Sequence, residues 1–329
     1  MSQIGYPTDT IIAVTYRCDA RCDMCNIWQL KPQEYLTVDD YAKVPSTLRD
    51  VNISGGEAFM RKDIIDIVKV IHQKCNGPRI VVSTNGFRSE QIITKMEELR
   101  KWIPKIGIGV SLDGIGETHN KIRGIKKAYE KTLKTLQQLR EREFGNVRIG
   151  FTAMNDNADE MKRVYDLATS MGFEFTMAVA QNSDIYFSTQ ANDQVKVGAL
   201  TDALGYVIKK ELLSHHPKRW MRAYYESGSL LFNEEGRRLL ECRAGIDFFY
   251  LAPEGLVYPC LTIPSIMGDL KGHTFEEVWE SERADQVRAE IKGCEKCWMI
   301  CTARSALRRN LPKALTWIAK EKIKNHLKT

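Results

Sequence analysis

The sequence predicts an α/β fold with a parallel sheet, and two observations lead to this prediction. In the first half of the 329 residues, apolar and β-branched segments alternate with segments whose apolar residues recur at helical spacing. Strands that alternate with helices at this pace are typical of βα units in a parallel sheet. Six such units are too few for a complete eight-stranded barrel. The strand-like segments are 11–15, 51–54, 80–84, 106–112, 147–153 and 173–180.

Four amphipathic segments between these strands are expected to form helices. Cys75 falls at the end of the first of them, where we expect a buried structural thiol. From about residue 181 to residue 241 the alternation stops, and long helical segments with mixed aromatic and charged residues predict a connector. The four expected helices are 64–73, 90–101, 129–142 and 158–170.

A small α+β extension is expected to begin at Cys242. Its first part, 248–260, has the pattern of a hairpin that turns at Glu254 and Gly255. A helical segment is expected over 274–291. The sequence therefore divides into four predicted segments, which are 1–190, 191–241, 242–302 and 303–329.

Composition predicts a cytoplasmic protein. The apolar content of 43% is ordinary for a globular chain, no run of about 18 apolar residues predicts a membrane span, and the N-terminus lacks the pattern of a signal peptide. In such a compartment, nine cysteines are better explained by metal binding than by disulfides. Eight of the nine fall into two groups, near opposite ends of the chain.

The first cysteine group is Cys18, Cys22 and Cys25, with the spacing C-x3-C-x2-C. Three thiolates on one short loop can hold three irons of a [4Fe–4S] cluster and leave the fourth iron open. Because most such clusters have four cysteine ligands, this set indicates a cluster that takes part in chemistry. The alternatives are a zinc site or chance spacing, although structural zinc normally takes four ligands and no histidine lies near this loop.

Glycine and polar residues follow the next three strands. Reactive groups cluster beyond the carboxyl ends of parallel strands, so these residues are expected to lie near the cysteines. Glycines permit close backbone approach, and an acid beside them can accept bonds from an ammonium group. The guanidinium of Arg123 can grip a carboxylate at two places, although a surface salt bridge is the alternative. The candidate residues are Gly55, Gly56, Glu57, Ser83, Asn85, Ser111, Asp113 and Arg123.

The second cysteine group lies in the C-terminal extension. Cys242 and Cys260 are separated by seventeen residues, and Gly255 precedes Cys260 as G-x4-C. The remaining three follow as Cys294-x2-Cys297-x3-Cys301. A second metal site is therefore expected, either an iron–sulfur cluster or a zinc ribbon.

The first cysteine group and the glycine motif resemble those of the radical SAM enzymes. The resemblance implies an open, partial (β/α)6 barrel in which the open iron binds S-adenosylmethionine (SAM). It implies that Gly55-Gly56-Glu57 binds the amino group of SAM, and that Ser111 and Arg123 hold its carboxylate. Met24 stands where the family usually has an aromatic residue near the adenine.

The second cysteine group resembles the SPASM or twitch extension of the same family. Five cysteines suit one auxiliary [4Fe–4S] cluster, and the ligands this implies are Cys242, Cys260, Cys294 and Cys297. Cys301 is then a spare thiol, although it could replace either Cys294 or Cys297. A fully ligated cluster would accept the electron left on a substrate radical, whereas an open cluster would bind substrate.

The resemblance implies reductive cleavage of SAM to a 5′-deoxyadenosyl radical, hydrogen abstraction, and an external electron donor such as flavodoxin or ferredoxin. The first strand starts near residue 11, which leaves no room for a leader-peptide domain and favours a small molecule, sugar or lipid headgroup as substrate. The alternatives are a maturase of a ribosomal peptide or protein, and a non-catalytic zinc or iron–sulfur protein. Residues expected near substrate are Gln181, Asn182 and Asp184, and Asn155 is expected to face either SAM or substrate.

The C-terminal tail is basic. From residue 302 onward there are eight Lys and Arg against one acid, which leaves the rest of the chain near neutral. An amphipathic helix is expected there, and it can either rest on an anionic membrane surface or pack on the body with its charges in water. No motif for nucleic-acid recognition accompanies the charge, so no nucleic acid is expected. The apolar residues of the expected helix are Leu311, Leu315, Trp317, Ile318, Ile323 and Leu327.

Overall fold

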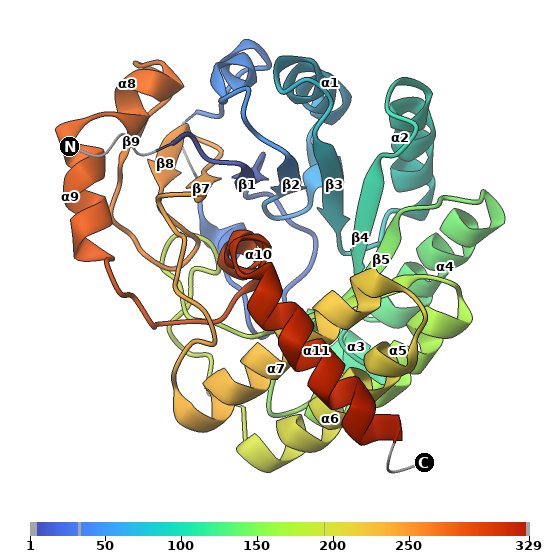
Figure 1. Cartoon of the computed structure of the whole chain (residues 1–329). Helices are drawn as coiled ribbons and strands as arrows, with labels where there is room; N and C mark the ends of the chain where they lie inside the picture. The colour runs from blue at the N-terminus through green and yellow to red at the C-terminus, as the bar shows by residue number, and fades with distance from the viewer. Residues whose placement is uncertain (1–4, 32–33, 194, 327–329) are drawn as a thin grey trace.

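One sheet of nine strands runs through the chain. The structure is a computed structural model, and it describes residues 5–31, 34–193 and 195–326. The strand order is β6-β5-β4-β3-β2-β1-β7-β8-β9, and neighbours from β6 to β7 are parallel (Figure 1). This confirms the predicted α/β fold with a parallel sheet that is not closed into a barrel. The strands are β1 Asp9–Ala13, β2 Asp50–Ser54, β3 Arg79–Thr84, β4 Gly107–Ser111, β5 Val147–Ala153, β6 Glu174–Val179, β7 Phe248–Leu251, β8 Leu256–Tyr258 and β9 Gly268–Asp269.

Helices cover the outer side of the sheet. Figure 1 shows α1, α2, α4 and α5 around the strands, each close to its predicted position. Alternate strand residues such as Ile12, Ile53 and Val82 pack under these helices in the main apolar core. Cys75 ends α1 as a buried thiol, as predicted. The first helices are α1 Ile64–Lys74, α2 Ser89–Trp102, α3 Glu117–Arg123, α4 Ala128–Glu141 and α5 Met161–Ser170.

The C-terminal extension joins the main sheet. The predicted hairpin is confirmed, because β7 and β8 are antiparallel. Its first strand also pairs in parallel with β1, where Asp9 lies opposite Phe248, and this pairing was not predicted. The helical segment expected over 274–291 is divided into two helices, because the Ser281 side chain caps the second by accepting a hydrogen bond from the Ala284 amide. These helices are α8 Phe275–Trp279 and α9 Glu282–Glu290.

Four further helices form the connector and the C-terminal tail. The segment expected to be a helical connector contains α6 and α7, which follow a stretch without helix or strand over 181–193. The break between α10 and α11 falls at Asn310. No helix among the described residues is long and apolar enough to cross a membrane. The bounds are α6 Val197–Leu213, α7 Pro217–Glu235, α10 Ile300–Arg309 and α11 Leu311–His326.

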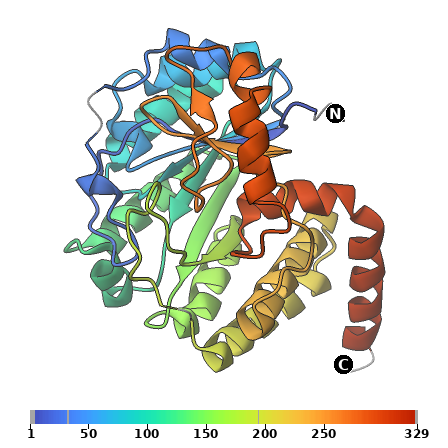
Figure 2. The same ribbon diagram turned by 90° about the vertical axis from the view of Figure 1, so that its left-hand side faces the viewer.

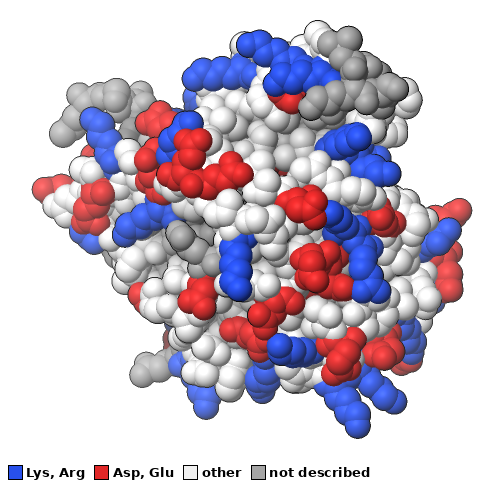
Figure 3. All heavy atoms as spheres, turned by 90° about the horizontal axis from the view of Figure 1, so that it is seen from below, with Lys and Arg blue, Asp and Glu red and all other residues white. Residues whose placement is uncertain are grey.

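Part of the positive charge of the tail is neutralised by the body. Arg308 on α10 forms ion pairs of 2.6 Å with Asp9 and Asp50, and Arg309 pairs with Asp247 at 2.7 Å. The tail is therefore not a free basic stripe. Acidic and basic side chains are also interspersed over most of the face in Figure 3.

The last helix, α11, packs on the body along one side only. Ala314 and Ile318 are buried, and Trp317 packs on Tyr224 of α7 at 5.4 Å between ring centroids. Figure 2 shows the helix at the edge of the molecule. Packing on the body was one of the two expected arrangements. Leu327 lies outside the described residues.

The contact between α7 and the second cysteine region predicts that alanine substitution at two helical glycines changes the free energy of unfolding in opposite directions. A Cβ at Gly228 would lie 2.5 Å from ring atoms of the buried Trp298, whereas a Cβ at Gly205 of α6 meets nothing. We expect Gly228→Ala to lower the free energy of unfolding by about 1–3 kcal/mol through overpacking. We expect Gly205→Ala to raise it by about 0.5–1 kcal/mol. Urea titration followed by circular dichroism measures both, and equal effects would contradict the packing.

Candidate active site and cluster sites

The cysteine loop, residues 18–25, is held by backbone contacts to the end of β2. The Gly56 amide donates to the Thr15 carbonyl and the Glu57 amide to the Arg17 carbonyl, both at 2.8 Å. Gly55 has a φ of +126°, and a Cβ there would lie 2.2 Å from the Thr15 oxygen. A Cβ at Gly56 would lie 2.3 Å from the Arg17 oxygen. Both glycines are therefore required for the close approach of the two loops.

A second contact attaches the cysteine loop to the end of α3. Helix ends leave carbonyl groups without partners in the helix. The amide of Arg21 donates to the Arg123 carbonyl and that of Asp23 to the Ile122 carbonyl, both at 2.9 Å. Gly124 ends the helix with a φ of +62°, and a Cβ there would lie 2.3 Å from the Arg21 oxygen. The cysteine loop is thus fixed between β2 and α3.

The three thiols of this loop are the predicted ligands of an iron–sulfur cluster. Burial raises the pKa of Cys18 to about 12 and that of Cys25 to about 11, and it also raises the pKa of Cys22. Each of these thiols must lose its proton to bind iron. The guanidinium of Arg123, whose Nη1 lies 3.5 Å from the Cys22 sulfur, favours the thiolate. Three thiols, a cation and a closely held loop suit a cluster with three protein ligands.

The carboxylate of Glu57 accepts hydrogen bonds from other groups of the protein. It is fully buried and accepts hydrogen bonds from the Thr84 hydroxyl at 2.9 Å, the Asn85 amide at 2.8 Å and the Phe59 amide at 3.1 Å. Burial raises its pKa to about 7, against the effect of these bonds. The predicted role of this side chain toward the amino group of SAM stays a prediction. In the structure, the Glu57 carboxylate links the end of β2 to the end of β3.

Arg123 and Asp113 form a buried ion pair of 2.5 Å beside Cys22. Burial would lower the pKa of Arg123, but the attraction of Asp113 and Cys22 outweighs it and the pKa is raised. The other Asp113 oxygen accepts from the Thr152 amide at 2.8 Å. Arg123 is therefore placed next to the cysteine loop, with one partner already bound to it.

Sequence reasoning missed several residues that support this site. Asp19, inside the cysteine loop, accepts 2.7 Å bonds from Asn85 Nδ2 and Arg88 Nε. His119 Nδ1 accepts from the Asp113 amide at 3.0 Å, and its pKa is lowered to about 2 by burial and by Arg123. The position of Asp19 between two cysteines was the one sequence signal that could have identified it as a residue of this site. Ser83 donates to Asn52 at 2.9 Å, while Ser111 is partly exposed on the inner face of β4.

A loop after β6, residues 181–193, connects the two cysteine regions. The Asn26 amide donates to the Phe187 carbonyl at 2.6 Å, and the Ser183 hydroxyl to the Leu261 carbonyl at 2.5 Å. Asn182 and Asp184, expected near substrate, bond to Asn192 and Gln190 within the loop. Gln181 donates to the Val179 carbonyl at 3.4 Å, and Asn155 accepts from the Lys196 amide at 2.7 Å. These side chains shape the loop.

Tyr186 of this loop lies between the two cysteine groups. Its hydroxyl is 2.6 Å from the Ser54 hydroxyl at the end of β2, and its ring packs edge-on against Tyr250 of β7 at 5.5 Å. Burial raises its pKa to about 12, and its electrostatic neighbours include Cys25 of the first group and Cys301 of the second. Both cysteine groups therefore face the same part of the interior.

The second cysteine group converges on an apolar cluster. Cys260, Cys297 and Cys301 are buried in it, and the partly buried Cys242 packs against it. Burial raises the pKa of Cys301, as do the nearby Cys297, Cys260 and Cys242. Cys294 lies near Cys297 but is not among the described members of this cluster. The structure therefore favours Cys301 over Cys294 as the fourth ligand, and the ligand set stays a prediction.

Comparison with known proteins agrees with this geometry. The family model described as Radical SAM superfamily matches residues 12–168, and the one described as Iron-sulfur cluster-binding domain (SPASM) matches residues 242–298. The AdoMet-dependent heme synthase of Methanosarcina barkeri is 27% identical over 74% of this chain and 71% of that protein. The sporulation killing factor maturation protein SkfB of Bacillus subtilis is 22% identical over 88% of this chain and 69% of that protein.

A solved structure shows the same fold. The structure of anSMEcpe with bound AdoMet covers 95% of this chain and 100% of its own, with a TM-score of 0.63 and 14% sequence identity. The chain belongs to the radical SAM superfamily of enzymes. Within that superfamily it carries a SPASM domain, so its cofactors are SAM, the [4Fe–4S] cluster that binds SAM, and auxiliary iron–sulfur.

The second cysteine group generates a test of its ligands. We expect Cys301→Ala to reduce the iron content of the reconstituted protein from about eight per chain toward about four, because the auxiliary cluster loses a ligand. Cys294→Ala is the matched control and should retain about eight. Iron and acid-labile sulfide analysis measures both, together with electron paramagnetic resonance of the reduced protein. Loss of iron in Cys294→Ala alone would contradict the assignment.

Proposed function

We propose that this enzyme oxidises a small molecule, a sugar or a lipid headgroup that binds inside the open barrel. When bound, the cofactors supply a 5′-deoxyadenosyl radical that removes a hydrogen atom and an auxiliary cluster that takes up the remaining electron. The residues proposed to hold the first cluster are Cys18, Cys22 and Cys25. An external donor such as flavodoxin or ferredoxin would supply the first electron.

The position of Tyr186 carries this proposal. The tyrosine packs against the apolar cluster that contains Cys301, and the next residue, Phe187, accepts a hydrogen bond from the amide of Asn26, which follows Cys25. We therefore expect a molecule near Tyr186 to be within reach of both cluster sites. An oxidation needs both sites close to one substrate. The 181–193 loop, which binds the cysteine loop on one side and the Leu261 carbonyl on the other, would hold that substrate away from water.

Peptide maturation is the second candidate function. The relatives favour it, since one is named as a maturation protein for a sporulation killing factor and another as PqqA peptide cyclase, which is 22% identical over 85% of this chain. The heme synthase, in contrast, is named for a small-molecule product.

The first experiment measures 5′-deoxyadenosine. We expect the reconstituted protein to form it from SAM and dithionite without oxygen, and Cys22→Ala to form none because a cluster ligand is lost. Cys75→Ala, which alters a thiol far from both groups in the sequence, should keep the activity. If a dialysable, protease-resistant cell fraction stimulates the reaction, the substrate is a small molecule. Stimulation that disappears after protease treatment would establish a peptide instead.

We also propose that the protein is cytoplasmic and that its helix α11 makes peripheral contact with an anionic membrane surface. Leu311, Leu315 and Ile323 are 45%, 57% and 60% exposed on this helix. The exposed Lys313 and Lys320 lie on the same helix, and such a combination binds the interface of anionic bilayers.

Vesicle binding tests the role of α11. We expect the protein to sediment with phosphatidylglycerol vesicles and not with phosphatidylcholine vesicles. The double substitution Leu315→Ser, Ile323→Ser should reduce the bound fraction severalfold, because it removes apolar area. Val197→Ser, at another exposed apolar residue, is the control and should bind as the wild type does. Equal binding of both variants would exclude this face of the helix.

A further inference from the structure

Charged side chains surround the amino-terminal end of the open barrel. They come from the starts of strands and from α7 and α10, at the end of the barrel opposite the cysteine loop. Arg79 of β3 pairs with Asp50 of β2, and Arg304 of α10 lies 3.6 Å from Asp50 and 3.8 Å from Asp9. Each of these arginines therefore has an acidic partner.

Arg148, at the start of β5, differs from these arginines because it forms no ion pair with the described acidic residues. Its Nε and Nη2 atoms are buried and have no hydrogen-bond partner among the described residues. The charged groups that face it are Arg79, Arg304 and Arg222, which are cations, and the single acid Glu174. That acid is already bound, since Arg222 lies 3.2 Å from it and Lys218 also pairs with it. Burial and the neighbouring cations lower the pKa of Arg148 to about 10, so it remains charged at neutral pH.

Solvent reaches the inner face of the sheet above Arg148. Each strand from β2 to β6 has at least one partly exposed inward residue, whereas the residues of β1 and β7 are all buried. Most of the partly exposed residues are small, and the stem of Arg148 passes 3.5 Å from the Cβ position of Gly109. Small side chains therefore line this face of the sheet. They are Asn52, Ser83, Gly109, Ser111, Gly150, Thr152, Thr176 and Ala178.

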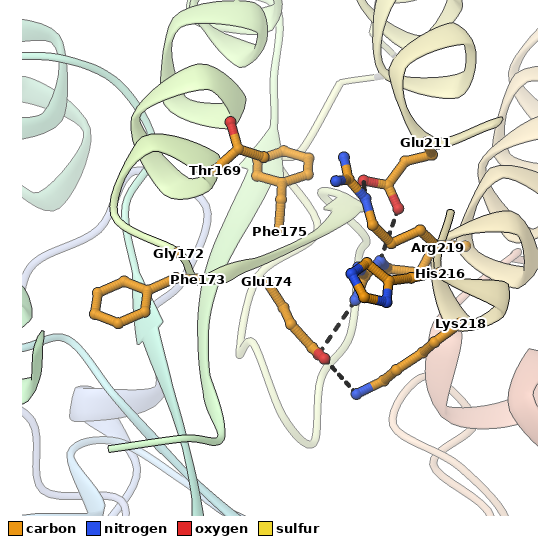
Figure 4. A pocket seen from close by; sticks show the side chains of 10 residues that line it. Thr169, Gly172, Phe173, Glu174, Phe175, Glu211, His216, Lys218 and Arg219 are labelled. Atoms are coloured by element: carbon orange, nitrogen blue, oxygen red, sulfur yellow. Dashed lines mark hydrogen bonds and ion pairs between the residues drawn. The ribbon is translucent and has the colours of Figure 1, made fainter. Parts of the chain in front are cut away.

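The outer cavity near this end has no such unpaired cation. It has a volume of about 410 Å³, and Figure 4 shows Glu174, Glu211, Lys218 and Arg219 along its wall. Its cations are paired, because Lys218 bonds to Glu174 and Arg219 lies 3.0 Å from Glu211. Among the described charged residues at this end of the barrel, Arg148, on the inner face of the sheet, has two buried nitrogens without a hydrogen-bond partner and forms no ion pair.

We propose that Arg148 binds an anionic group, a carboxylate or a phosphate, at one end of an elongated substrate. This inference rests on the proposed function and specifies its substrate class. The planar guanidinium can hold either group through two parallel hydrogen bonds. Arg148 is four residues before Thr152, so it lies about 13 Å along β5 from the level of Asp113 and the cysteine loop. An anchored substrate of that length presents its far end to the radical.

Anion-dependent thermal unfolding of the reconstituted protein tests this site. We expect inorganic phosphate, or succinate as the carboxylate probe, to raise the unfolding midpoint of the wild type saturably at constant ionic strength set with chloride. Arg148→Met should abolish that rise. In chloride alone it should unfold at or above the wild-type midpoint, because an unpaired cation among three others is removed. Arg140→Met, at an exposed residue of α4, should respond to the anions as the wild type does.

The outcomes separate the anion site from the proposed function. The site is overturned if neither probe stabilises the wild type, if Arg148→Met keeps the response, or if Arg148→Met lowers the midpoint in chloride as a structural ion-pair residue would. A response to phosphate alone identifies a phosphorylated substrate, and a response to succinate alone identifies a carboxylate. Because the titration does not need SAM cleavage, a wild type that binds anions but forms no 5′-deoxyadenosine would refute the function and leave the anion site standing.

Discussion

The contact between the loops after β1 and β2 determines where the cysteine loop lies. Gly55 and Gly56 have no side chain, so their backbone reaches the carbonyl oxygens of Thr15 and Arg17 at distances that any Cβ would prevent. The end of α3 then fixes the other side of the cysteine loop through its free carbonyl groups. The three cysteines are close in sequence, and these two backbone contacts leave their loop little freedom.

The parallel pairing of β7 with β1 brings the second cysteine region to the same interior. With it, Tyr250 of β7 packs on Tyr186, which packs against the apolar cluster of the second cysteine group. The next residue, Phe187, accepts a hydrogen bond from the amide of Asn26, beside the first group. A single strand pairing therefore relates the two cluster sites to each other, which is the geometric condition for a reaction that uses both.

The two ends of the open barrel differ in their chemistry. At the carboxyl ends of the strands, polar side chains such as Glu57 and Asp113 are bound to other protein groups and support loops. At the amino-terminal end, α10 brings its arginines to the acids Asp9 and Asp50 and neutralises them. Arg148 is left with no such partner. A buried guanidinium without a partner is costly, which is why we relate it to a ligand.

By itself, the sequence determined the order of the first six strands and of four helices between them, the hairpin and the cysteine spacings. Alternating apolar patterns and short motifs depend on neighbouring residues, so they can be read locally. Only the tertiary structure decided that β7 extends the main sheet, that Cys301 joins Cys242, Cys260 and Cys297, and that Arg148 lacks a partner. These features join segments up to 239 positions apart, as in the pairing of Asp9 with Phe248. Long-range packing and burial select such contacts, and no local pattern records them.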